Sequence, residues 1–169
     1  MKADKILVPL DGSDLAEAAI PAAVAAVTSR SSTLVLVRAA EARTLPGTDP
    51  IEAQIDAVQE AEVYLAPVKT RLEQQEVAKV EANVWYGPAA SAIIEAAQLY
   101  KPDLIVMSTH GRSGFGRLIF GSVAESVLRG TTVPILLIRP AGAPVELPGG
   151  LETARPATPD PRTKTEALR

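Results

Sequence analysis

Two stretches of the sequence follow apolar runs and carry polar or glycine residues that could contact a ligand. The first, Asp11-Gly12-Ser13-Asp14, directly follows an apolar run, and the second extends from His110 to Gly121, just before a helical pattern. Backbone amides of a glycine-rich loop and the positive end of a helix dipole together bind phosphate. The second stretch holds four glycines and two arginines: Gly111, Gly114, Gly116, Gly121, Arg112 and Arg117. It favours a site for a phosphate-bearing ligand, although a plain turn explains the glycines equally well.

Two common phosphate-binding motifs do not fit this second stretch. Gly111 and Gly116 have the P-loop spacing, but Arg117-Leu118 follows where that motif requires Lys and then Ser or Thr. The G-x-G-x-x-G fingerprint fails as well, because Ile119 occupies its third glycine position.

Catalytic chemistry has few candidate residues. His110 is the sole histidine, and no second acid, base or nucleophile is evident beside it, so we expect it to anchor the loop. Asp11 is either a ligand-binding carboxylate at a strand end or a turn residue beside Gly12 and Ser13. The absence of cysteine and of further histidines excludes disulfides, cysteine zinc sites, iron–sulfur clusters and multi-histidine metal sites.

Length and composition are those of one globular domain with a tail. The chain has 169 residues, of which 47% are hydrophobic and 22% charged, and its net charge is −3. Without a basic run, nucleic acid and anionic membrane are not expected as main partners. Apolar runs are too short for a signal peptide or a membrane span, so we expect a cytoplasmic protein.

Five apolar runs alternate with helical patterns along the chain. Strands are predicted at residues 5–10, 33–39, 79–86, 103–109 and 132–138, and helices at about 14–30, 51–72, 88–100 and 122–129. Such alternation predicts an α/β fold, an open parallel sheet with helices on both faces. The polar alternation in 79–86 and the early Pro134 in 132–138 predict edge strands.

Finer signals predict how the helices begin, break and pack. Either Ser13 or Asp14 is expected to cap the first helix, and Asp14 with Glu17 fits a capping box, as does Ser122 with Glu125. Gly130 has the position of a helix-terminating glycine. Pro21 should kink or shorten the first helix, and Pro67 should interrupt the second. An apolar stripe on the second helix is expected to face the core: Ile51, Ile55, Val58, Leu65, Val68 and Leu72.

The last segment, residues 141–169, differs from the rest. It holds five prolines, three glycines and no aromatic residue. Such a segment cannot bury enough apolar surface to offset the loss of conformational entropy on ordering. We therefore expect a folded domain over residues 1–140 and a disordered tail over 141–169.

At four places the sequence resembles the universal stress protein family. The matching stretches are KILVPLDGSD, TLVLVRAAE, DLIVMSTHGRSGFGRLIFGSVAESVL and VPILLIRP, and together they span residues 2 to about 140. ATP-binding members of that family share the pattern G-x-x-G-x(9)-G-[ST]. Gly111, Gly121 and Ser122 match it, whereas Ser108 replaces the first glycine. The resemblance implies a five-stranded parallel sheet in the order 3-2-1-4-5.

The resemblance also implies a ligand and roles for individual residues. The ligand would be ATP, with or without Mg²⁺, and the protein would form a homodimer through the last strand, Val133 to Ile138. The Asp11 carboxylate would accept hydrogen bonds from ribose hydroxyls, and the Ala39 backbone would lie beside adenine. Other residues would line the nucleoside (Pro9, Leu10), form the pocket floor (Met107, Ser108) or surround the phosphates (Gly111, Arg112, Gly121, Ser122, Val123).

Three functions remain open at this level. The first is an ATP-dependent stress or signalling switch with slow or no hydrolysis. The second is a weak ATPase, for which the sequence offers no convincing base. The third is a nucleotide-free dimeric interaction protein, which the replacement of glycine by Ser108 would favour.

Overall fold

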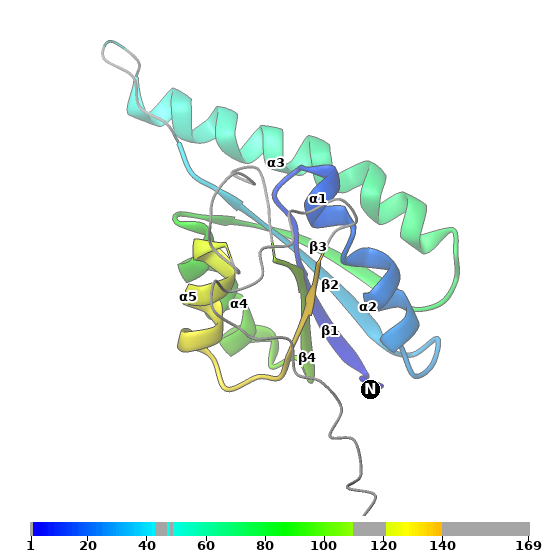
Figure 1. Ribbon diagram of the computed structural model, residues 1–169. Coiled ribbons are helices and arrows are strands. Elements are labelled where there is room, and N and C mark those ends of the chain that lie inside the picture. The colour runs from blue at the N-terminus through cyan, green and yellow to red at the C-terminus, as the bar shows by residue number, and fades with distance from the viewer. Residues whose placement is uncertain (1, 43–46, 48, 110–120, 140–169) are drawn as a thin grey trace, which may run out of the picture.

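The protein folds around one five-stranded parallel sheet (Figure 1). The computed structural model describes residues 2–42, 47, 49–109 and 121–139. The strand order is β3-β2-β1-β4-β5, and all pairs are parallel. The strands are β1 (Lys5–Pro9), β2 (Thr33–Ala40), β3 (Lys79–Tyr86), β4 (Leu104–Ser108) and β5 (Ile135–Ile138). The predicted fold class, the strand order and the two edge strands are confirmed.

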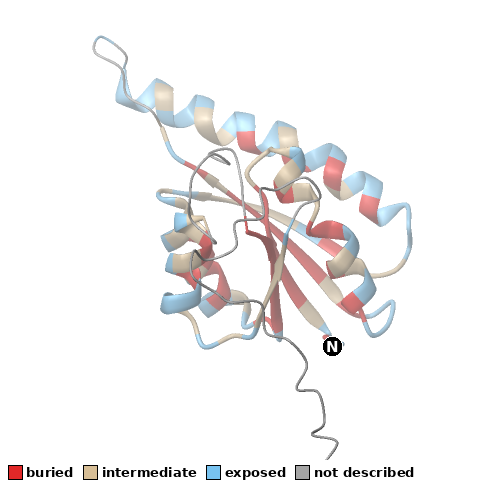
Figure 2. Cartoon of the chain, in the orientation of Figure 1, coloured by how far each residue is buried: buried red, intermediate tan, exposed pale blue. Residues whose placement is uncertain are grey.

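Five helices cover the two faces of the sheet. They are α1 (Asp14–Glu17), α2 (Ile20–Ala26), α3 (Pro50–Glu73), α4 (Ala89–Tyr100) and α5 (Ser122–Gly130). Helices α1, α2 and α3 pack on one face with Ile6, Val8 and Leu36, whereas α4 and α5 pack on the other with Leu7 and Val35. Burial is concentrated on the central strands (Figure 2), as expected for strands covered on both sides.

The first helical segment is divided into two short helices. Ser13 is the N-cap of α1, and its hydroxyl accepts a hydrogen bond from the Ala16 amide. The predicted capping box of Asp14 and Glu17 is wrong, because the Glu17 carboxylate instead accepts a hydrogen bond from Tyr64 on α3. Pro21 lies in the first turn of α2, where its missing amide costs least, so the expected shortening by this proline is confirmed.

Helix α3 departs from its predicted packing in two ways. Leu65, Val68 and Leu72 are buried as expected, but Ile51 and Ile55 are 68% and 49% exposed, so the prediction of a core stripe is wrong for the first two turns. These turns lie past the region where α3 packs against the sheet (Figure 1).

Pro67 lies inside α3 without ending it, so the predicted interruption is also wrong. The carbonyl that its missing amide would pair with belongs to Val63, which is 74% exposed. We infer that water can hydrate this carbonyl, which lowers the cost of the proline.

Helix α5 also begins and ends differently from prediction. Its N-cap is Gly121 with no side-chain cap bond among the described residues, so the Ser122–Glu125 capping box is wrong, and Glu125 pairs with Arg129 instead. Gly130 is the last helical residue rather than a residue beyond the end. A Cβ there would collide with the Ile94 side chain of α4, so this glycine permits close packing of α4 and α5.

The predicted tail, residues 141–169, lies outside the described residues. Among the described residues, no helix combines the length and the apolar character needed to cross a membrane.

Candidate functional site

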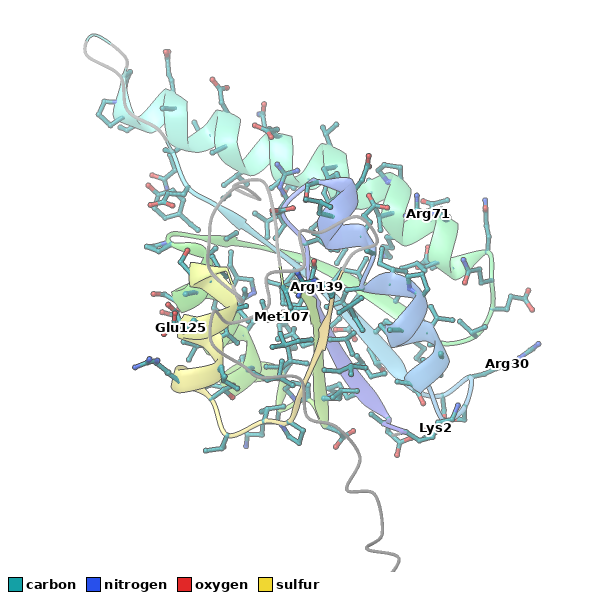
Figure 3. All side chains as sticks on the ribbon, in the orientation of Figure 1. Lys2, Arg30, Arg71, Met107, Glu125 and Arg139 are labelled. Atoms are coloured by element: carbon teal, nitrogen blue, oxygen red, sulfur yellow. The ribbon has the colours of Figure 1, made fainter. Side chains whose placement is uncertain are left out.

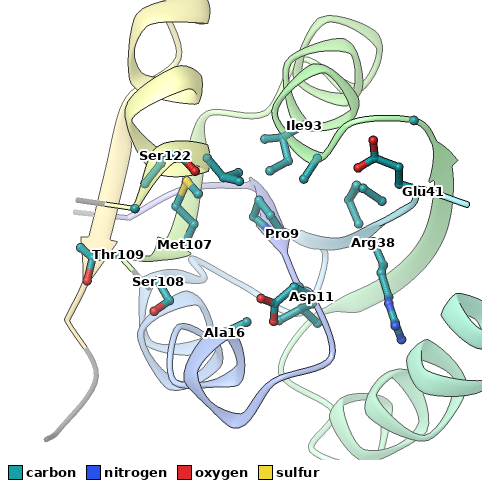
Figure 4. A pocket seen from close by; sticks show the side chains of 18 of the residues that line it. Pro9, Asp11, Ala16, Arg38, Glu41, Ile93, Met107, Ser108, Thr109 and Ser122 are labelled. Atoms are coloured by element: carbon teal, nitrogen blue, oxygen red, sulfur yellow. The ribbon is translucent and has the colours of Figure 1, made fainter. Parts of the chain in front are cut away.

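A cleft of about 630 Å³ opens at the carboxyl ends of β1, β2 and β4 and at the start of α5 (Figure 4). In a parallel sheet this edge is where ligands bind, at the point where the strand order reverses. Nine of the eleven predicted site residues line the cleft: Pro9, Leu10, Asp11, Ala39, Met107, Ser108, Gly121, Ser122 and Val123. The other two, Gly111 and Arg112, lie outside the described residues, as does His110.

The Asp11 side of the cleft is a tight turn after β1. The Leu10 amide still donates to the Val37 carbonyl at 2.8 Å, which extends the pairing of β1 with β2 up to the turn. Asp11 Oδ1 then accepts hydrogen bonds from the Ser13 amide at 2.9 Å and the Ser13 hydroxyl at 2.6 Å. Gly12 between them has a φ of +87°, a conformation that other residues adopt only with strain. The turn therefore holds the carboxylate at the cleft (Figure 4).

The opposite side of the cleft is the end of β4. Met107, Ser108 and Thr109 are all buried. The Gly121 amide donates to the Thr109 carbonyl at 2.9 Å, so these two residues meet at the cleft although eleven positions separate them. A Cβ on Gly121 would lie 2.9 Å from that carbonyl oxygen, so this close approach requires glycine.

The start of α5 supplies backbone amides. Because Gly121 carries no capping side chain, the first-turn amides of Ser122, Val123 and Ala124 have no partner within the helix. These amides and the helix dipole place partial positive charge at the cleft wall. The wall can thus bind an anionic group such as phosphate.

Several cleft residues were not predicted from the sequence. They are Ala16, Val37, Arg38, Glu41, Ala42, Gly87, Ala89, Ile93, Thr109 and Ala124. Glu41 directly follows β2, so the rule that ligands bind at carboxyl ends of strands could have identified it. Ile93 and Ala89 come from α4, whose position over the cleft has no local sequence signal.

Arg38 is the one cation among the described residues that line the cleft, and its side chain is 6% exposed. Its guanidinium extends toward α3 (Figure 4), where Nη2 lies 2.7 Å from the Glu60 carboxylate. The guanidinium carbon also lies 4.8 Å from the centre of the Tyr64 ring, a cation–π contact. Burial, followed by the hydrogen bond to Glu17, raises the pKa of Tyr64, so its hydroxyl remains a donor at neutral pH.

The cleft offers binding groups more clearly than catalytic ones. Within the described residues, no group of three or more His, Cys, Asp or Glu side chains could hold a metal ion. Among the described residues that line the cleft, the carboxylates are Asp11 and Glu41. A ligand with hydroxyl groups at one end and phosphate at the other would match the Asp11 turn and the α5 amides.

Comparisons with known proteins give the fold and the site a family context. A universal stress protein of Methanocaldococcus jannaschii is 30% identical over 140 residues, covering 80% of this chain and 81% of its own. One from Thermus aquaticus is 33% identical over 145 residues, covering 79% and 97%.

Solved structures give the same picture. The hypothetical protein MJ0577 superposes with a TM-score of 0.76 at 25% identity, covering 84% of this chain and 99% of that one. A universal stress protein family protein from Arabidopsis thaliana with AMP bound has a TM-score of 0.59 at 14% identity, covering 80% and 90%. A universal stress protein in complex with cAMP has a TM-score of 0.60 at 21% identity, covering 82% and 98%. At these identities the last two show similarity of fold alone.

The sequence model of the universal stress protein family matches residues 2–139, which is nearly all of the predicted domain. On this match and on relatives at 30% identity or more, the chain belongs to the universal stress protein family.

Proposed function

We propose that this protein binds ATP in the cleft and acts as a nucleotide-dependent switch in a stress or signalling response. The observation that carries the proposal is the meeting of the Asp11 turn, the end of β4 and the uncapped start of α5 around one cleft. Two proteins of the same fold were solved with AMP and cAMP, which supports an adenine nucleotide as ligand.

The cleft has room and suitable groups for such a ligand. In the proposed arrangement the Asp11 carboxylate accepts hydrogen bonds from ribose hydroxyls, and the Ala39 backbone lies beside the base. The α5 amides bind phosphate oxygens, with Gly111 and Arg112 as further predicted contacts. Because the described residues offer no cluster of metal-ligating side chains, Mg²⁺ would bind mainly through the phosphates.

We propose slow or no hydrolysis. Phosphoryl transfer to water requires a positioned water and stabilisation of charge on the transferred group. The Asp11 oxygen that accepts from Ser13 already has two donors, which suits binding better than proton abstraction.

The first experiment is to identify the nucleotide that purifies with the protein. The protein is denatured, and the supernatant is separated by ion exchange. ATP near one per chain supports a switch with slow turnover, whereas mostly ADP favours the weak ATPase. Absence of nucleotide, together with no ATP uptake in a calorimetric titration, contradicts the proposal.

Replacement of one carboxylate then tests the site itself. Asp11→Asn should weaken ATP binding by about tenfold, because a charged acceptor for a hydroxyl contributes more than one kcal/mol. Asp14→Asn is the matched control, because Asp14 is exposed in the first turn of α1 and does not line the cleft. Calorimetry gives both affinities, and equal affinities for the two variants would count against Asp11 as a ligand.

The second candidate function is a nucleotide-free dimeric interaction protein. It is favoured by Ser108, which is buried at the cleft where the ATP-binding pattern has glycine. The dimer would form through Val133 to Ile138, where β5 is an edge strand with partly exposed residues. Sedimentation of the protein with and without ATP tests the dimer, and a monomer at micromolar concentration would contradict it.

A further inference from the structure

Arg38 is an unusual residue for its place on β2. Leu34 and Leu36 precede it on the same face of the strand and are almost completely buried in the core beneath α2 and α3. Arg38 continues this face, and its side chain is 6% exposed. A buried guanidinium is costly unless partners compensate, and an apolar residue often packs as well in such a position. The charge at this position therefore calls for an explanation beyond packing.

Two residues of α3 hold the guanidinium in place. Nη2 donates to the Glu60 carboxylate at 2.7 Å, and Nη1 donates to the Glu60 backbone carbonyl at 3.3 Å. The Tyr64 ring, one turn further along α3, makes the cation–π contact. Tyr64 is itself fixed by its hydrogen bond of 2.9 Å to Glu17 of α1. The position of the guanidinium is thus set by α3.

The guanidinium also lies directly against the turn that carries Asp11. A Cβ built on Gly12 would lie 3.3 Å from both Cζ and Nη1 of Arg38. The guanidinium therefore lies close beside the Gly12 turn, and a side chain at this position would have to displace it by a few tenths of an ångström. Gly12 joins Asp11 to Ser13, whose amide and hydroxyl both donate to the Asp11 carboxylate.

We propose that Arg38 is a positioning residue for the ribose-binding carboxylate. Held by Glu60 and Tyr64, its guanidinium supports the Gly12 backbone and so keeps the Asp11 carboxylate turned to the cleft. The inference rests on the proposed function, because it deepens the role of Asp11 at the same site. By this proposal α3 helps to position the nucleotide site through Glu60 and Tyr64, although it supplies none of the described residues that line the cleft.

The test compares ATP with 2′-deoxyATP, which lacks one hydroxyl that Asp11 would bind. For the unaltered protein the dissociation constants should differ by about tenfold, the contribution of one hydrogen bond to a carboxylate. In Arg38→Met, which retains an apolar stem, this ratio should fall to about two. Glu60→Gln should reduce the ratio in the same direction but by less, since it removes the charge of the Glu60 side chain and leaves the backbone carbonyl and Tyr64 contacts. Arg38→Lys should restore part of the ratio, because an ammonium keeps the charge without the planar fork.

The ratio distinguishes positioning from a general loss of charge. Loss of a cation near the cleft weakens ATP and 2′-deoxyATP binding alike and leaves their ratio unchanged. Arg30→Met is the matched control, because Arg30 extends away from the body of the protein (Figure 3) and pairs only loosely, at 3.7 Å, with Glu76. A ratio in Arg38→Met equal to that of the unaltered protein, or a ratio of one in the unaltered protein, overturns the inference.

A second measurement does not depend on nucleotide. Hydrogen exchange at the Ser13 amide, which bonds to Asp11, should be at least about tenfold faster in Arg38→Met than in Arg30→Met, while β1 amides stay protected. Unchanged exchange at Ser13 overturns the inference even where ATP binds. If exchange at Ser13 is faster in Arg38→Met but the unaltered protein binds no ATP, Arg38 does hold the turn in place. In that case the proposed function is the part that is refuted.

Discussion

Gly12 is the residue on which the geometry of the Asp11 turn depends most directly. Its φ of +87° strains any other residue, and a Cβ would press against the Arg38 guanidinium. Gly12→Ala should therefore destabilise the protein by about 2–3 kcal/mol, from backbone strain together with the displaced arginine. Chemical denaturation measures the loss, and calorimetry should show weaker ATP binding in the same variant.

Gly47 provides the matched control for that substitution. It has a similar φ of +92°, but a Cβ there would meet nothing within 4 Å. Gly47→Ala should cost only the backbone strain, about 1 kcal/mol, with ATP affinity unchanged. Equal losses of stability in the two variants would show that the contact of Gly12 with Arg38 contributes nothing.

At the scale of the element, α3 divides into an exposed half and a buried half. Leu65 is 2% exposed in the core, whereas Ile55 on the same predicted stripe is 49% exposed. Leu65→Ala should cost about 2–4 kcal/mol because it leaves a cavity, and Ile55→Ala should change the free energy of unfolding by less than about 0.5 kcal/mol. Urea denaturation of the two variants makes the comparison.

The same pair of variants shows whether the first turns of α3 contact another surface in solution. A loss above about 1 kcal/mol in Ile55→Ala would mean that Ile55 is covered there, contrary to its exposure in the monomer. The measurement should be repeated at several protein concentrations, because a contact between copies would make the loss depend on concentration.

At the scale of the whole molecule, we propose that residues 1–140 fold without the rest of the chain. The last strand of the sheet, β5, ends at Ile138 and pairs with β4 along Ile105 to Ser108. Deletion of residues 145–169 should leave the melting temperature within about 2 °C, since the segment lacks the apolar surface to stabilise the domain. Differential scanning calorimetry measures the change, and a fall of more than about 5 °C would contradict the domain boundary.

A longer deletion is the control for the assay. Removing residues 133–169 also removes β5. The edge of β4, whose residues are buried in the full-length protein, would then be exposed. This variant should lose cooperative unfolding or aggregate, because an unpaired apolar edge strand pairs readily with other chains.

Much of the fold and part of the site could be predicted from the sequence. Continuous apolar runs such as Leu34 to Val37 require cover on both faces, and their alternation with helices requires parallel strands. Parallel strands end at one edge, so Asp11 after β1 and Ser122 at the start of α5 are expected at that edge. That β1 and β4 are neighbours, which brings the two residues to one cleft, is implied by the family resemblance and not by the pattern. Nine predicted residues indeed line one cleft, whereas their roles in binding remain predictions.

Only the tertiary structure decided how side chains distant in the sequence meet. Periodicity shows which face of α3 is apolar, but not that the supporting sheet stops short of Ile51. The capping pattern predicted a local partner for Glu17, yet its carboxylate accepts a hydrogen bond from Tyr64 of α3 instead. Arg38 and Glu60, 22 positions apart, gave no joint signal, because an ion pair between elements depends on the distance and burial that packing alone sets. The sequence by itself determined the class of fold and the edge of the sheet that holds the cleft, and the packing of α3 determined what supports that cleft.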